Sequence, residues 1–218
     1  SDQAREHFLQ ANALYQEGKP HEALLLYQAL THQTPSVWFN KGLCFYALGK
    51  YSQALVALRY AQRGANGRLL TKIHPVLMKV QHALQVPYDS AWYTMLLSLS
   101  TFGSTFLLQI LFLLFLVLYL FLVFFRGIKG WKSIVLHLGF LVMVSVCGVR
   151  YWVTEQKKAV ALQDKVMLFA GPHKDFHVIA QLHAGQEVKV VQQSQSWYKV
   201  DFHGVQGWVQ ETELEQII

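Results

Sequence analysis

A chain of 218 residues has room for one or two globular domains. Apolar residues make up 53% of the chain. Charged residues make up only 15%, whereas they make up about a quarter of a typical soluble domain. This composition excludes a chain that consists only of ordinary soluble domains. The formal net charge of +6 combines nine Lys/Arg with four Asp/Glu in residues 1–88, four with one in 89–153, and six with eight in 154–218. No single domain therefore carries the net charge.

The N-terminal region, residues 1–88, contains two copies of a pattern with a period of 31 residues. Gly18-Lys-Pro-His-Glu-Ala-Leu24 aligns with Gly49-Lys-Tyr-Ser-Gln-Ala-Leu55, and Ala11 aligns with Gly42. Small residues let the two helices of a hairpin approach closely, and a glycine after each first helix suits a left-handed cap. One more helix, over 68–86, is expected to cover the second copy. The pattern predicts an all-α domain of two helix pairs and a capping helix.

This region resembles the tetratricopeptide repeat, in the second copy through Trp38, Gly42, Phe45, Gly49, Tyr51, Ala54 and Leu55. The resemblance implies that the first helices of the repeats form a partner-binding concave face. Carried over by position, that face comprises Arg5, Phe8, Asn12, Tyr15, Gln16, Phe39, Asn40, Leu43 and Tyr46. The lysine that accompanies such asparagines in carboxylate-binding relatives is replaced by Phe8, which puts that ligand in doubt. The alternative is a domain that serves only for packing.

The same region is strongly basic after its first repeat. No acidic residue lies between Glu22 and Asp89, whereas seven basic residues do: Lys41, Lys50, Arg59, Arg63, Arg68, Lys72 and Lys79. This stretch is either a solvated surface or a contact surface for an acidic protein or anionic lipid headgroups.

The middle of the chain predicts a two-helix membrane hairpin. After an interfacial segment, 89–103, the expected transmembrane helices are 104–125 and 133–153, since twenty uncharged residues rise about 30 Å as a helix. The turn between them, 126–132, carries Arg126, Lys129 and Lys132, and such basic turns stay in the cytoplasm. Both flanking domains are then expected outside it. The start at Ser1 fits removal of a signal peptide as well as a cloning remnant.

Residues 154–218 show short alternating runs separated by glycines, which predict five or six strands in a small barrel. The ending resembles the bacterial SH3-like (SH3b) domain through Trp197, Tyr198, Gly204, Gly207 and Trp208. Some relatives bind cell-wall peptides, and this domain could equally dock onto another protein of the same system.

The motifs for catalysis and metal binding do not occur in this sequence. His21-Glu22 lacks the second histidine of a zinc protease, and the ten histidines show no metal-ligand spacing. There is also no phosphate-binding loop and no nucleophile elbow. No catalytic residue, metal or cofactor is predicted, and the chain is not expected to be an enzyme.

Together the predictions describe a multidomain membrane protein with an all-α tetratricopeptide-repeat domain, a two-helix transmembrane hairpin and a small all-β SH3-like barrel. This order of modules resembles the BatE-type members of the Bat (Bacteroides aerotolerance) proteins. The resemblance implies a bacterial inner-membrane location with both domains periplasmic, and contact with membrane lipid. Its implied partners are von Willebrand factor A-domain Bat proteins, a BatD-type protein and, indirectly, a MoxR-type AAA+ ATPase. Nucleic acid is not an expected partner.

Two functions remain open at this point. The first is a non-catalytic scaffold or interaction subunit of such a complex. The second is an independent envelope anchor or sensor whose SH3b domain binds peptidoglycan.

Overall fold

The structure is a computed structural model that describes residues 2–88 and 157–217, together with 110, 112–119, 121, 137–141, 144–145 and 148. The chain divides into two compact units. One unit is formed by Ser1–Thr94 and Lys157–Ile218, and the other by Met95–Gln156.

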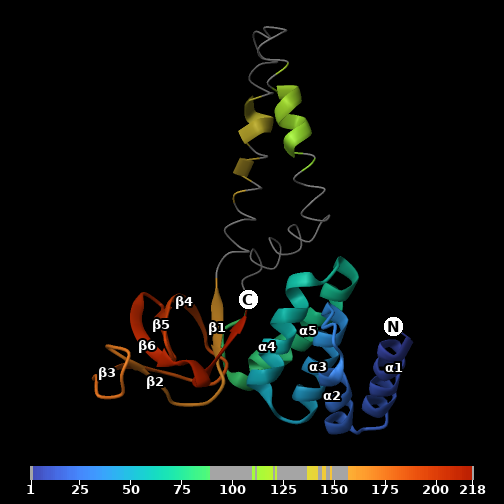
Figure 1. The fold of residues 1–218 in the computed structure, drawn as a ribbon, viewed down its shortest axis with the longest axis horizontal. Helices are drawn as coiled ribbons and strands as arrows, with labels where there is room; N and C mark the ends of the chain where they lie inside the picture. The colour runs from blue at the N-terminus through green and yellow to red at the C-terminus, as the bar shows by residue number, and fades with distance from the viewer. Residues whose placement is uncertain are drawn as a thin grey trace. The chain divides into compact units, whose positions relative to one another are not determined.

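Five helices come first in the first unit (Figure 1). They are α1 (Asp2–Gln16), α2 (Pro20–Ala29), α3 (Pro35–Ala47), α4 (Tyr51–Gly64) and α5 (Gly67–Leu84). Pro20 and Pro35 stand at helix starts, where the missing N–H of proline costs nothing. The Asn66 side chain accepts from Leu69 N at 2.9 Å and caps α5. These local signals delimit the helices.

Positions one period apart have the same role in the two helix pairs. Gly18 and Gly49 both have a positive φ, 78° and 71°, in the turns that follow α1 and α3. Ala11 is fully buried, and a Cβ added at its counterpart Gly42 would lie 2.9 Å from the Leu58 side chain. The helices of each pair therefore approach so closely that only a small residue fits.

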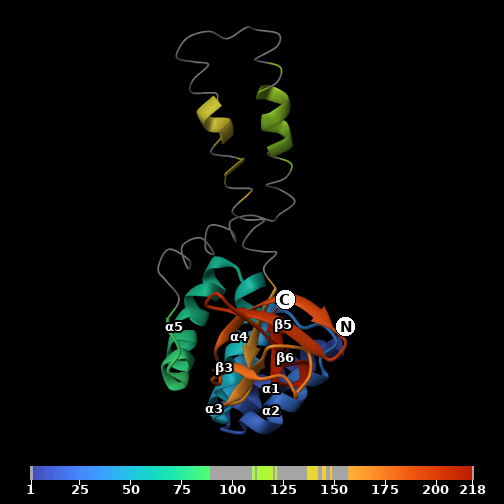
Figure 2. The ribbon, with the colours of Figure 1, turned by 90° about the vertical axis from the view of Figure 1, so that its left-hand side faces the viewer.

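Seven strands follow in the same unit. They are β1 (Lys158–Ala161), β2 (Val166–Phe169), β3 (Val178–Leu182), β4 (Glu187–Ser194), β5 (Trp197–Phe202), β6 (Val205–Gln210) and β7 (Leu214–Ile217), with a 3-10 turn at Glu211–Glu213. All pairings are antiparallel, and the strand order is β3-β2-β6-β5-β4-β1-β7. Figure 2 shows the sheet from a second direction.

The prediction of a small barrel with five or six strands is wrong. The sheet is open, with β3 and β7 at its two ends. β7 pairs with β1, and its Gln216 carbonyl accepts from the Tyr60 hydroxyl of α4 at 2.8 Å. Val160 and Ile217 also join the hydrophobic core of the helices. A helix thus covers the edge that barrel closure would have paired with a strand.

The prediction of transmembrane helices over 104–125 and 133–153 is contradicted as well. In the described part of the chain, no helix is both long and apolar enough to cross a membrane. The segment 89–103, the turn 126–132 and the remaining positions of both predicted helices lie outside the described residues.

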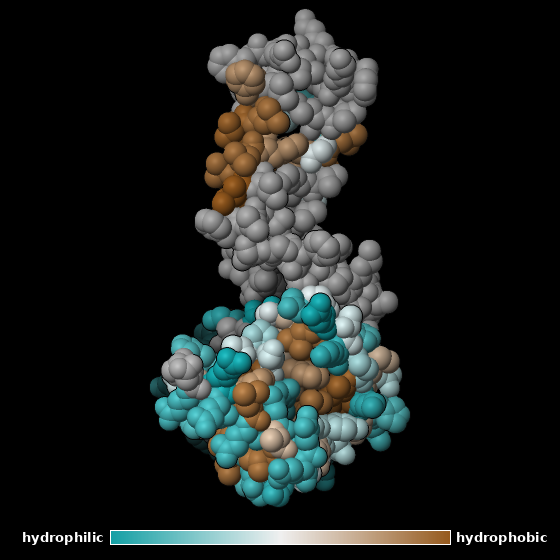
Figure 3. All heavy atoms as spheres, turned by 90° about the vertical axis from the view of Figure 1, so that its right-hand side faces the viewer, coloured by the Kyte–Doolittle hydropathy of each residue, from teal (hydrophilic) through white to brown (hydrophobic). Residues whose placement is uncertain are grey.

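In the second unit, aromatic contacts join the described helical pieces 112–119 and 137–141. The rings of Tyr119 and Phe140 stack at 4.7 Å, and Tyr119 meets His137 edge-on at 5.5 Å. Leu113 and Leu141 are more than half exposed, and Figure 3 shows apolar surface over the described residues of this unit.

Candidate functional site

Two asparagines from the face predicted on α1 and α3 lie in direct contact. The Asn40 side-chain amide donates to Asn12 Oδ1 at 2.9 Å. They stand 28 residues apart in the sequence and come from different helix pairs. The predicted face thus brings its two amide side chains together.

Tyr27 on α2 completes this network. Its hydroxyl donates to Asn12 Oδ1 at 2.5 Å and accepts from Asn40 Nδ2 at 3.1 Å. Tyr27 is only 1% exposed, and burial raises its pKa to about 12, so the hydroxyl keeps its proton at neutral pH. The hydrogen bonds of this network use Asn12 Oδ1 and Asn40 Nδ2. They do not use Asn12 Nδ2 or Asn40 Oδ1. One amide donor and one amide acceptor match the groups of a peptide backbone.

Two aromatic residues of the predicted face, Phe8 and Tyr15, pack against the core cluster that contains Tyr27. The centres of the Phe8 and Tyr27 rings are 5.9 Å apart in an edge-on arrangement, whereas Tyr46 packs against the core of α4 and α5. Burial raises the pKa of Tyr15 above its usual value. Phe39 and Leu43 of the predicted face are half-buried, whereas Arg5 and Gln16 are exposed. The face is therefore a partly accessible aromatic surface with one cation and a fixed pair of amides.

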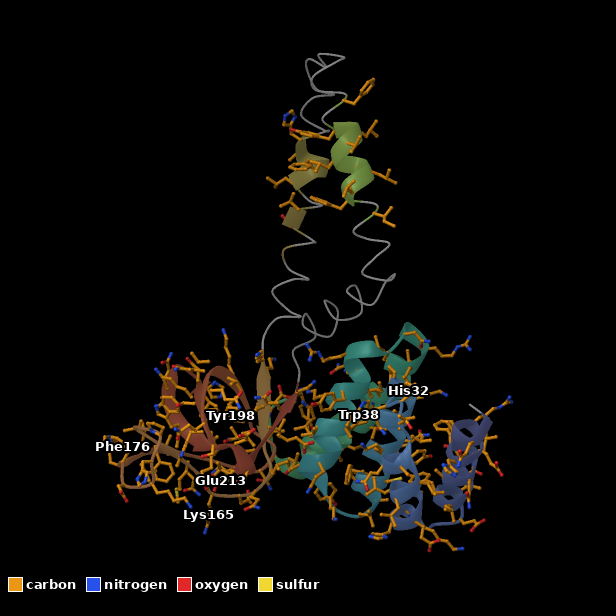
Figure 4. The ribbon with its side chains drawn as sticks, in the orientation of Figure 1. His32, Trp38, Lys165, Phe176, Tyr198 and Glu213 are labelled. Carbon is orange, nitrogen blue, oxygen red and sulfur yellow. The ribbon has the colours of Figure 1, made fainter. Side chains whose placement is uncertain are left out.

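Sequence reasoning missed a second constellation, where the α3–α4 pair meets the sheet. The rings of Trp38 and Tyr60 stack at 4.5 Å, and Lys41 Nζ lies 3.7 Å from the centre of the Trp38 ring. Figure 4 labels Trp38 among these side chains. Burial lowers the pKa of Lys41, while it raises the pKa of Glu215 on β7, and each charge partly offsets the shift of the other. The residue types of Trp38, Lys41 and Tyr60 alone do not indicate this contact with the sheet.

An ion pair lies in the same joint. Arg59 Nη2 on α4 is 2.6 Å from Glu187 Oε1 on β4, and Arg59 Nε donates to the same oxygen at 2.7 Å. Lys158 Nζ is 3.9 Å from the other carboxylate oxygen. The Arg59 side chain is 9% exposed and the Glu187 side chain 23%. The helices and the sheet are thus joined by charge as well as by apolar contact.

Two cavities border this joint. The larger, about 630 Å³, lies between the ends of α4 and α5 and the loops of the sheet, with Lys50, Gln85, Asp164 and His183 in its wall. The smaller, about 380 Å³, includes Arg59. Among the described residues, no group of three His, Cys, Asp or Glu side chains lies close enough to hold a metal ion.

Four of the five signature residues near the C-terminus have clear structural roles. Trp197 and Tyr198 are 7% and 5% exposed, and the Tyr198 hydroxyl donates to Glu211 Oε1 at 2.7 Å. A Cβ added at Gly207 would lie 2.5 Å from Leu168 Cγ, and Gly204 has a φ of +87°. These residues belong to the core and the turns of the domain, so their role is to stabilise the fold and not to bind a ligand.

The last signature residue, Trp208, is half-buried on β6 and pairs with Phe169 of β2. A comparison with protein families matches the bacterial SH3 domain to residues 164–215. This segment is a bacterial SH3 domain. The match spans β2 to β6 and the start of β7, whereas β1 precedes it. A bacterial SH3 domain fits a role in protein interaction or in peptidoglycan binding.

A comparison with curated proteins gives no match to the chain. The residues Arg126, Lys129 and Lys132, predicted as a cytoplasmic turn, lie outside the described residues.

Proposed function

We propose that this chain is a non-catalytic interaction subunit of a bacterial envelope complex of the Bat/MoxR type. It binds protein partners through the helical face and through the SH3 domain. The observation that carries the proposal is the joint between the two domains. Arg59 bonds Glu187, and Tyr60 bonds the Gln216 carbonyl, so both binding surfaces belong to one compact unit.

The helical face supplies the first binding surface. We interpret the pairs α1–α2 and α3–α4 as two tetratricopeptide repeats, in which the first helices carry the ligand face. Support comes from the close approach at Gly42 and from the contact between Asn12 and Asn40. The Asn12 Nδ2 donor and the Asn40 Oδ1 acceptor take no part in this network, and Phe8 packs beside its Tyr27, which suits an extended peptide.

The order of helical repeats and SH3 domain supports the proposed partners. They are von Willebrand factor A-domain Bat proteins and a BatD-type protein, with an indirect link to a MoxR-type AAA+ ATPase. In this proposal both domains lie on the periplasmic side of the inner membrane.

Affinity purification of the tagged full chain from its native cells tests the proposal. We expect a von Willebrand factor A-domain protein or a BatD-type protein to co-purify in near-stoichiometric amount. Recovery of the chain alone would contradict the proposed function.

A second candidate function is an independent envelope anchor or sensor that binds peptidoglycan. The match of residues 164–215 to the bacterial SH3 domain favours it. A pull-down of the full chain on purified cell-wall sacculi distinguishes the two functions. Saturable binding to sacculi without a protein partner would favour the anchor, and no binding would favour the subunit.

A further inference from the structure

The larger of the two cavities at the joint lies where α4 begins and α5 ends. Its volume of about 630 Å³ falls within the range of about 300–1,000 Å³ that small-molecule sites span. Polar side chains make up most of its wall, and the loops β1–β2 and β3–β4 of the sheet complete it. An apolar ligand would leave these polar groups without partners, so the wall suits a polar ligand.

The sheet side of the cavity is held in place by hydrogen bonds and by contact with α5. Ala184 N donates to Asp164 Oδ1 at 3.1 Å, and Gly185 N donates to the Ala161 carbonyl at 2.8 Å. Gly185 has a φ of +81°, and a Cβ added there would lie 2.5 Å from the Leu84 side chain of α5. The loop β3–β4 thus packs directly against the end of α5, and the wall does not need a ligand to form.

The first turn of α4 presents backbone donors at this cavity. Helical bonding starts with Ala54 N, which donates to the Lys50 carbonyl at 2.9 Å. Lys50 is the N-cap residue, and its side chain caps no N–H group. In the described part of the chain, no acceptor pairs with the N–H groups of Tyr51, Ser52 and Gln53, and these residues line the cavity. A helix start of this kind favours an anion.

A buried hydroxyl lies at the same helix start. Ser52 lines the cavity and is only 5% exposed, yet its hydroxyl forms no hydrogen bond with any described residue. Buried polar groups nearly always have a partner, because an unpaired one lowers stability. A polar ligand in the cavity would supply that partner. Ser52 therefore points to a ligand at this position independently of the backbone donors.

The equivalent helix start in the first helix pair is neutralised by the chain itself. Pro20 stands in the first turn of α2 and has no N–H, and Glu22 brings a carboxylate to the same turn. Lys19, the counterpart of Lys50 one period earlier, forms an ion pair with Glu17 at 3.0 Å. The start of α2 therefore provides a matched control for the start of α4.

The cavity wall carries charges of both signs. Lys50 forms no ion pair with any described residue, although Asp164 lies in the same wall. The Asp164 side chain is 74% exposed, and its carboxylate lies 4.0 Å from His183 Nδ1. α5 ends at this cavity with Gln85 as its C-cap residue, and a helix C-terminus favours a cation. A ligand with both charges complements this wall better than a simple anion.

We propose that this cavity binds a small zwitterion, namely an amino acid or a short peptide with both of its ends free. The ligand carboxylate accepts hydrogen bonds from the first turn of α4 and from the Ser52 hydroxyl, and it lies beside Lys50. The ligand ammonium group lies beside Asp164 and the end of α5. This inference goes beyond the proposed function, because it requires no protein partner.

The experiment titrates the full chain with the dipeptide L-alanyl-L-alanine in a calorimeter. The N-acetylated dipeptide lacks the ammonium group, and the dipeptide amide lacks the carboxylate. We expect saturable binding of the dipeptide and about tenfold weaker binding of either blocked form, because charge-assisted hydrogen bonds are the strong ones. Inorganic phosphate should bind no better than the blocked forms. No saturable binding, or equal binding of all these probes, would overturn the inference.

Amide hydrogen exchange locates the site. The N–H groups of residues 51–53 have no acceptor among the described residues, so they should exchange quickly in the free protein. With the dipeptide, exchange across 51–53 should slow several-fold and saturably, whereas exchange across 20–22 at the start of α2 should not change. Protection that falls only outside the cavity wall would assign the dipeptide to another site and overturn the inference.

Lys50→Met and Lys19→Met form a matched pair of variants at equivalent positions of the two helix pairs. We expect Lys50→Met to weaken dipeptide binding about tenfold and Lys19→Met to leave it unchanged. Asp164→Asn keeps an acceptor for Ala184 N and should abolish the discrimination between the dipeptide and its N-acetylated form. Equal effects of the two lysine variants, or unchanged discrimination by Asp164→Asn, would contradict the proposed site.

Ser52→Ala separates a role in ligand binding from a role in folding. Its hydroxyl has no partner among the described residues, so its removal should not lower the melting temperature. Dipeptide binding should weaken several-fold, because the ligand carboxylate loses a donor. A lower melting temperature with unchanged binding would show that the hydroxyl serves the fold, and it would contradict the inference.

Discussion

Arg59 and Glu187 lie 128 positions apart in the sequence, yet their charged groups meet at 2.6 Å. Arg59 also donates to Gln62 Oε1 at 3.0 Å, so the guanidinium is held from its own helix. Lys158 of β1 approaches the same carboxylate. This relationship makes the position of the SH3 domain on α4 testable by substitution.

Arg59→Met should destabilise the protein by about 3 kcal/mol, because the carboxylate of Glu187 would remain partly buried without its main partner. The double variant Arg59→Met with Glu187→Leu should recover most of this loss, since it buries no unpaired charge. Urea unfolding of the full chain measures both free energies. Arg68→Met, on the exposed side of α5, is the control and should change stability by less than about 0.5 kcal/mol. Additive losses in the double variant would show that the pair does not join the domains.

Gly207→Ala should destabilise the SH3 domain by about 1–3 kcal/mol. The added Cβ would lie 2.5 Å from Leu168 Cγ and 3.0 Å from the Phe169 carbonyl oxygen, and that backbone cannot move cheaply. Gly67→Ala is the matched control, because a Cβ there meets nothing within 4 Å at the start of α5. Thermal unfolding compares the two variants. Equal melting temperatures would contradict the close approach of β2 and β6.

The buried tyrosines should make stability fall at high pH. Burial raises the pKa of Tyr27 to about 12, and burial together with the bond to Glu211 raises the pKa of Tyr198 to about 12. The unfolded pKa is about 10. Their stabilising contribution is therefore complete below about pH 10 and is lost as the pH rises toward 12, by about 1.4 kcal/mol per pH unit for each.

Urea unfolding at several pH values above about 9, with absorbance titration of the tyrosines, checks this dependence. Tyr27→Phe should reduce the slope, because it removes one of the two buried hydroxyls. Ionisation of every tyrosine near pH 10 would contradict the burial of both hydroxyls.

Tyr27→Phe also tests the network on the helical face at neutral pH. It removes one of the two donors to Asn12 Oδ1, and we expect a loss of about 1 kcal/mol. The loss should be smaller when Asn12→Ala is already present, because the hydroxyl then keeps only its bond from Asn40 Nδ2. A double-mutant cycle measured by urea unfolding checks this. Fully additive losses would mean that the hydroxyl and the amide are not coupled.

Local patterns made part of this fold predictable. The period that pairs Gly18 with Gly49 marks turns with a positive φ in both copies, and only short stretches of chain decide those turns. The Trp197 to Trp208 signature likewise located the segment that matches the bacterial SH3 domain. In each case the residues that carry the pattern are near one another in the sequence.

Contacts between distant segments were not predictable. The sequence around Arg59 does not indicate that Glu187 is its partner. Tyr27 could equally be an ordinary core residue by its type, although its hydroxyl bonds to Asn12. The barrel prediction failed because closure depends on which strands meet, and β7 contacts α4 instead of β3. The transmembrane prediction relied on the length and the apolar composition of two uncharged runs, and no described helix is both long and apolar enough to cross a membrane.

In the proposed function, the helical face and the SH3 domain both recruit protein partners. The most direct test is quantitative mass spectrometry of the complex that is purified with the tagged chain from native cells. Wild type is compared with the helical-face variants Leu43→Ala and Arg5→Glu and with Leu25→Ala, which alters a residue 54% exposed on α2. We predict near-stoichiometric partner with wild type and Leu25→Ala, and at least a fivefold loss with the face variants at unchanged melting temperature. Recovery of the chain alone, or equal partner recovery in all four, would contradict the account.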